Sequence, residues 1–127
     1  METMETQYFQ EHLPDKWVVV RIEGGEFPLT YKVFACWQGG YLEANRWKMN
    51  SGIQKVEEEK THWVFTGFSG SRYLCGKKQY GLTYFGDTVL GNFIEKAKTR
   101  GVSLEILPPE TDWKNLLVTP EIPSIEK

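Results

Sequence analysis

The sequence predicts an α+β fold, in which a curved antiparallel meander of about six to seven strands carries one main α-helix at about residues 87–100. Three observations lead to this prediction. Short β-branched or alternating runs fill residues 16–75, glycine-containing turns separate them, and the apolar pattern becomes helical near residue 87. Parallel strands would need longer crossovers than these turns allow, so we expect antiparallel pairing.

The predicted strands share a β-branched or alternating composition and stop at turn signals such as Ser51-Gly52. The first of them, KWVVVRIE, is rich in valine and isoleucine, which favour strands. In YKVFACWQ, Val33 and Trp37 lie on one side of the strand, and Phe34 and Cys36 lie on the other. The predicted strands cover residues 16–23, 31–38, 46–50, 53–59, 62–66, 71–75 and 102–107.

The segment DTVLGNFIEKAKTRG, residues 87–101, has the pattern of one amphipathic helix. We expect Asp87 to accept hydrogen bonds in the first turn and Gly101 to end the helix in a left-handed conformation. Lys96, Lys98 and Arg100 suit the negative end of the helix dipole. The apolar residues recur at helical spacing and form one stripe, which consists of Val89, Leu90, Phe93, Ile94 and Ala97.

A chain of 127 residues suits a single domain with one core, which we place at residues 16–107. Residues 1–15 are expected to form an N-terminal tail with a short helical turn over 8–13. Residues 108–127 are expected to hold a short helix, anchored by Trp113, and a frayed tail with two prolines.

Composition narrows the classes of function. The net charge of −2 argues against general affinity for nucleic-acid phosphates, and no apolar run approaches the roughly 20 residues that span a bilayer. The N-terminus lacks the features of a signal peptide, so a cytoplasmic location with reduced thiols is expected for Cys36 and Cys75. No metal or cofactor site is predicted, because the cysteines and histidines lack ligand spacing.

The glycine-rich stretch TGFSGSRYLCGKKQYG, residues 66–81, is not a phosphate-binding loop, because a strand rather than a helix follows it. It is predicted to be a hairpin turn that uses the freedom of Gly67 and Gly70. A two-residue or four-residue loop would place His62 opposite Cys75. A three-residue loop would shift the register by one and separate them.

Three hypotheses for function follow, from different classes. The leading one is a small non-catalytic binding or regulatory module that acts by protein–protein contact, such as an immunity protein, an inhibitor or a mobile-element accessory of bacterial or phage type. Its binding face is predicted over Trp37, Tyr41 and Trp47, because rigid aromatic rings give contact area at low entropic cost. A homodimer formed through a sheet edge or an apolar face is also expected.

The two alternatives use other residues. A cysteine beside an imidazole can act as an activated nucleophile, so one alternative is a thiol-dependent enzyme that uses Cys75 and His62. Cations among aromatic side chains can bind single-stranded nucleic acid, so the other is a nucleic-acid binder that uses Arg72, Lys77 and Lys78.

Overall fold

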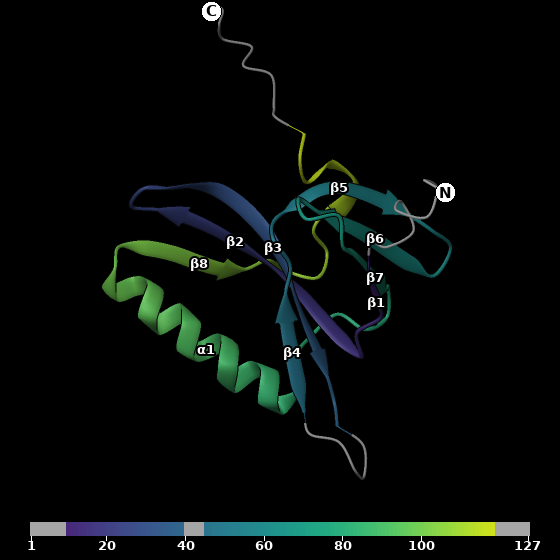
Figure 1. Ribbon diagram of the computed structural model, residues 1–127, viewed down its shortest axis with the longest axis horizontal. Coiled ribbons are helices and arrows are strands. Elements are labelled where there is room, and N and C mark those ends of the chain that lie inside the picture. The colour runs from purple at the N-terminus through teal and green to yellow at the C-terminus, as the bar shows by residue number, and fades with distance from the viewer. Residues whose placement is uncertain (1–9, 40–44, 119–127) are drawn as a thin grey trace, which may run out of the picture.

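The computed structural model describes residues 10–39 and 45–118, and it shows strands and one main helix in that part of the chain (Figure 1). The predicted α+β class is confirmed. The elements are β1 (Glu11–His12), β2 (Lys16–Gly24), β3 (Phe27–Trp37), β4 (Arg46–Met49), β5 (Ile53–Glu58), β6 (His62–Gly67), β7 (Arg72–Gly76), α1 (Tyr84–Thr99), β8 (Val102–Ile106) and the 3-10 helix η2 (Trp113–Asn115).

The strands divide between two four-stranded sheets, whereas one continuous curved meander was expected. One sheet has the order β1-β7-β6-β5 and the other has the order β4-β3-β2-β8. Every pair is antiparallel except β1 with β7. The chain passes from one sheet to the other between β4 and β5, where Gly52 adopts a φ of 133° that favours glycine.

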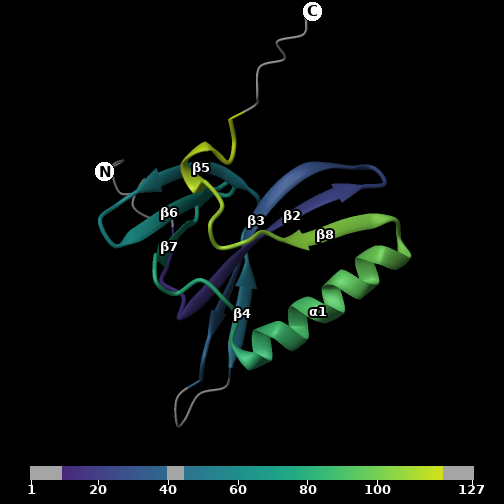
Figure 2. The same ribbon diagram turned by 180° about the vertical axis from the view of Figure 1, so that it is seen from behind.

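The molecule has three layers, as the two opposite views show (Figures 1 and 2). The first core cluster lies between the two sheets and includes Trp17, Val19 and Phe65. The second lies between the β4-β3-β2-β8 sheet and α1 and includes Val18 and Leu90. Because β2 is covered on both faces, its valine run is apolar without alternation.

The main helix begins earlier than the sequence indicated. It starts after Thr83, whose hydroxyl accepts from the Gly86 N–H at 2.9 Å, so Thr83 rather than Asp87 caps it. Asp87 instead lies in the first turn, where a carboxylate favours the positive end of the dipole. Gly101 has the predicted left-handed conformation, with a φ of 73°.

Segments near both ends of the described chain pack against the sheets. The helical turn expected over residues 8–13 is wrong for its described part, because Glu11–His12 form β1 and pair in parallel with Arg72 and Tyr73 of β7. Residues 8 and 9 lie outside the described residues. Near the other end, Trp113 of η2 is buried against Trp17, with ring centroids 5.5 Å apart. The expected anchoring by Trp113 is therefore confirmed.

The β6–β7 hairpin has the three-residue loop that shifts the register. The Gly67 N–H donates to the Ser71 carbonyl, and the Gly70 N–H donates to the Gly67 carbonyl, each at 2.9 Å. Gly70 has a φ of 95°, which this kind of loop requires at its last position. Consequently His62 lies opposite Gly76 and Cys75 lies opposite Trp63, so the predicted pairing of His62 with Cys75 is wrong.

Candidate functional site at the edge of β4

The two predicted tryptophans that the structure describes lie on opposite faces of one sheet. Trp47 pairs with Cys36 and therefore shares the face that α1 covers. Trp37, one residue further along β3, belongs to the face that packs against the first core cluster. The two rings therefore project from opposite faces of the sheet, although both line one hollow beside β4. Tyr41 lies outside the described residues.

Trp47 is held by aromatic contacts while its outer surface stays open. Its ring stacks on buried Phe34 with centroids 5.5 Å apart and planes at 16°. It also meets Phe93 of α1 edge to face at 5.2 Å and 73°. Even so, 38% of Trp47 is exposed to solvent. A large ring that is fixed but exposed offers contact area without much further loss of rotamer freedom.

Trp37 is fixed by polar and cationic neighbours on the other face. Its Nε1–H donates to the Leu13 carbonyl at 2.9 Å, and the Arg46 guanidinium carbon lies 4.8 Å from its ring centroid. His12 approaches the same ring edge-on at 6.3 Å. Burial, and next the charges of nearby Lys48 and Arg46, lower the pKa of His12. The His12 imidazole therefore stays neutral more readily than a free histidine does, and the positive charge of this surface is carried by Lys48 and Arg46.

We call the side of Arg46–Met49 that faces away from β3 the β4 edge. A single backbone hydrogen bond next to this strand shows which of its residues direct their backbone groups outward. Just beyond β4, the Asn50 N–H donates to the Val33 carbonyl at 3.0 Å. The β3–β4 register makes these two residues a directly opposed pair. Along an antiparallel ladder, residues bonded to the partner strand alternate with residues whose backbone groups point away.

Trp47 and Met49 are the residues of β4 whose backbone N–H and C=O groups point outward. Lys48, between them, is two residues from Asn50 and directs its backbone groups toward β3. Within the described ranges, β4 is the last strand of its sheet. The β4 edge therefore presents two residues with outward-facing donors and acceptors, and these alternate along the strand with the positively charged residues Arg46 and Lys48.

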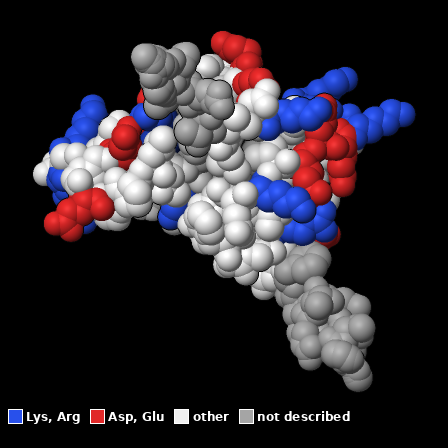
Figure 3. All heavy atoms as spheres, turned by 90° about the horizontal axis from the view of Figure 1, so that it is seen from above, with Lys and Arg blue, Asp and Glu red and all other residues white. Residues whose placement is uncertain are grey.

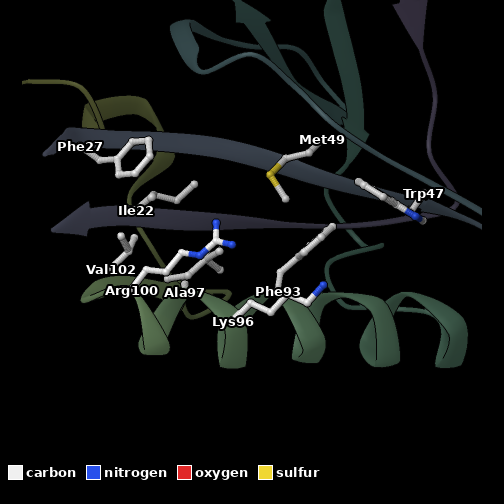
Figure 4. A pocket seen from close by; sticks show the side chains of 10 residues that line it. Ile22, Phe27, Trp47, Met49, Phe93, Lys96, Ala97, Arg100 and Val102 are labelled. Carbon is white, nitrogen blue, oxygen red and sulfur yellow. The ribbon is translucent and has the colours of Figure 1, made fainter. Parts of the chain in front are cut away.

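Two hollows lie beside β4. One, of about 450 Å³, lies along β4. The described residues that line it are His12, Trp37, Asn45, Arg46, Trp47, Lys48 and Phe85. The other, which we name the α1 groove, has a volume of about 610 Å³. Its described lining residues are Ile22, Phe27, Trp47, Met49, Phe93, Lys96, Ala97, Arg100, Val102 and Leu104 (Figure 4). Trp47 lines both hollows.

The thiol proposed for catalysis is enclosed. Cys75 has no solvent exposure, and burial raises its pKa well above the usual value of a thiol. His62 lies opposite Gly76, and its Nδ1 contacts the Thr61 hydroxyl at 2.8 Å. The structure therefore does not bring together the pair that the thiol-enzyme hypothesis requires.

Two of the three predicted nucleic-acid cations are paired with carboxylates. Arg72 forms an ion pair with Glu11, and Lys77 bonds Glu58 at 2.7 Å while its Nζ lies 5.2 Å from the Trp63 ring. Lys78 is exposed. On the face seen in Figure 3, basic and acidic side chains are interspersed rather than gathered by sign.

Comparisons with family models, with curated proteins and with solved structures find no match to this chain. No group of three metal-ligating side chains occurs among the described residues, and no described helix has the length and apolar character to cross a membrane. Sequence reasoning missed the α1 groove. The spacing of Phe93, Lys96, Ala97 and Arg100 places them on one helix face, but that spacing alone does not indicate a groove.

Proposed function

We propose that this chain is a small non-catalytic binding module that acts by protein–protein contact, and that its partner adds an extended segment to the β4 edge. The observation that carries the proposal is the outward-facing backbone of Trp47 and Met49 at the end of a sheet. A strand added there would gain main-chain hydrogen bonds, and the alternating side chains beside it would select its sequence.

The side chains of β4 define the sequence that would fit. Trp47 and Met49 face the α1 side of the sheet, whereas Arg46 and Lys48 face the Trp37 side. A complementary strand therefore places apolar residues opposite the first pair and acidic residues opposite the second. Each favourable cross-strand pair contributes roughly 0.2–1 kcal/mol, so specificity comes from the whole pattern rather than from one contact.

The same charges disfavour self-association at this edge. An antiparallel pair of β4 strands centred on Trp47 would place Arg46 of one copy opposite Lys48 of the other. Like charges that face each other across strands are destabilising. The β4 edge is thus protected against a second copy while staying open to an acidic partner, which is a common way to manage an exposed edge strand. A homodimer, which remains a prediction, would use another surface.

The proposal is tested by selection from a random twelve-residue peptide library. The selection uses the wild type, the variant Arg46→Glu/Lys48→Glu, and the control Lys60→Glu/Lys78→Glu, which makes the same change of net charge away from the β4 edge. Peptides that alternate acidic and apolar residues should be enriched on the wild type and the control. They should bind the edge variant about tenfold more weakly or worse, because attractive pairs become repulsive.

Amide exchange gives a readout specific to strand addition. On adding a selected peptide, the N–H groups of Trp47 and Met49 should exchange more slowly, whereas that of Lys48, which faces β3, should change little. Enrichment that is equal on all three proteins, or binding that leaves the Trp47 and Met49 amides unchanged, would overturn the proposal.

A further inference from the structure

The α1 groove is an apolar channel with a one-sided cationic rim. Its walls come from β2, β3, β4 and β8 on one side and from α1 on the other, and Figure 4 shows side chains of both sides around the space between them. Phe27, at the start of β3, is 62% exposed.

The cations on the rim are unpaired within the described part of the chain. Lys96 and Arg100 are one helical turn apart, line the groove, and form no ion pair with a described carboxylate. Lys98, on the same stretch of α1, instead meets Glu95 at 3.6 Å and lines a separate hollow. None of the described residues that line the α1 groove is acidic. The described lining of the groove is therefore mostly apolar and carries only positive charge.

We infer that the α1 groove binds a small amphipathic carboxylate, with its acyl chain along Phe27, Met49 and Ala97 and its carboxylate between Lys96 and Arg100. The size supports a small molecule, because about 610 Å³ lies inside the range of roughly 300–1,000 Å³ that is usual for such sites. Lys96 and Arg100 are four residues apart on one helix face, so both cations border the groove and can reach an anionic group in it, and hydrogen bonds between charged groups are the strong ones. This site is separate from the proposed strand contact, although Trp47 and Met49 border both.

The chemistry of the groove fixes how affinity should depend on the ligand. Each methylene that leaves water for an apolar wall should raise affinity about twofold to fourfold, so dodecanoate should bind more tightly than decanoate by about fourfold to sixteenfold. The dodecyltrimethylammonium ion has the same chain and the opposite charge. It should bind at least tenfold more weakly than dodecanoate, because it meets Lys96 and Arg100 with a like charge.

The test is calorimetric titration of the full chain with sodium dodecanoate below the concentration at which it forms micelles, with the methyl resonance of Met49 as a local probe. Lys96→Glu should weaken binding about tenfold, whereas the matched variant Lys98→Glu should change it less than twofold. Ala97→Trp, which fills the groove, should abolish the Met49 response, and circular dichroism verifies that each variant is folded. These results, with saturation at one ligand per chain, would support the inference.

Several outcomes would overturn it. These are equal affinity for the anionic and cationic amphipaths, equal losses in Lys96→Glu and Lys98→Glu, or a Met49 response that survives in Ala97→Trp. Binding to vesicles of an anionic phospholipid without any binding of monomeric dodecanoate would also overturn it, since the surface would then recognise a membrane rather than a single molecule. Failure of the peptide selection would leave this result unaffected, because the Lys96→Glu comparison does not involve the β4 edge.

Discussion

Gly86 is the position where the packing of α1 on the sheet can be tested most sharply. It lies in the first turn of α1, is buried, and faces Cys36 of β3. A Cβ added at Gly86 would overlap the Cys36 Sγ and would lie 3.2 Å from the Thr83 Oγ1, the oxygen that caps the helix. The variant Gly86→Ala therefore forces apart the helix start and the strand beneath it.

The magnitude follows from three contributions. Overpacking a buried contact costs about 1–3 kcal/mol. Disturbing the cap at Thr83 adds about 1 kcal/mol, and the better helix propensity of alanine returns at most about 1 kcal/mol. Gly86→Ala should therefore lower the free energy of unfolding by about 1–3 kcal/mol. For a chain of this length, that lowers Tm by roughly 4–10 °C.

Urea denaturation followed by circular dichroism measures the change, and two further variants isolate its cause. Gly91→Ala makes the same substitution in the same helix where nothing lies within 4 Å of the new Cβ, so it should stabilise the protein by up to about 1 kcal/mol. Cys36→Ala alone should cost about 1 kcal/mol by removing a buried atom. In the Cys36→Ala background, adding Gly86→Ala should leave the free energy of unfolding unchanged or raise it, because the added methyl group then has room.

The reasoning would be refuted if Gly86→Ala were as favourable as Gly91→Ala, since the α1–β3 contact would then be looser than the structure shows. It would also be refuted if the effects of Cys36→Ala and Gly86→Ala were additive. Residues in direct contact should show an interaction energy of about 0.5–3 kcal/mol, whereas distant residues show almost none.

Three other predictions follow from buried polar and titratable groups. Asn50→Ala should lower the free energy of unfolding by about 2–4 kcal/mol, because the Asn50 Oδ1 is the acceptor for the buried Val33 and Gly52 N–H groups; a loss below about 1 kcal/mol in urea denaturation would contradict this. Cys75 should react with iodoacetamide only when the chain unfolds, and His62→Ala should leave that rate unchanged; rapid alkylation of the native protein would contradict the burial of the thiol. The pKa of His12 is lowered from its ordinary value of 6.5, chiefly by burial, so the unfolded chain takes up a proton before the folded chain does. The free energy of unfolding should therefore fall as the pH drops below 6.5. In a His12→Gln variant it should depend less on pH in that window, and an unchanged slope would show that another group is responsible.

Local patterns predicted most of the elements because their causes are local. The apolar stripe of α1 and the glycines at the turns depend on neighbours within a few residues, so the class of fold could be read from them. The division into two sheets depends on which face of each strand is covered. The unbroken run from Trp17 to Val20 carried that information, since a strand buried on one face only would alternate.

The pairings at the candidate sites could not be read in the same way, because loop length decides register. GFSG is compatible with loops of two, three or four residues, and the observed three-residue loop moves Cys75 away from His62. The same limit applies to Trp37 and Trp47, whose faces are set by the β3–β4 register across an intervening loop. Lys96 and Arg100 were attributed to the helix dipole, and only the position of the β2–β3 hairpin shows that they also line a groove.

The two proposed sites both include Trp47, so a ligand at one of them would contact a residue of the other. The ring lies between Phe34 in the interior and Phe93 on α1, while its own backbone forms the outward-facing part of the β4 edge. A ligand in the α1 groove would press on the same ring that a strand at the β4 edge must align. Because both ligands would contact the same ring, any change that one ligand causes in the affinity for the other would be matched by the same factor in the reverse direction, since coupling between binding sites is reciprocal. If both proposals hold, titrating the selected peptide with and without dodecanoate would measure this coupling as a ratio of two affinities.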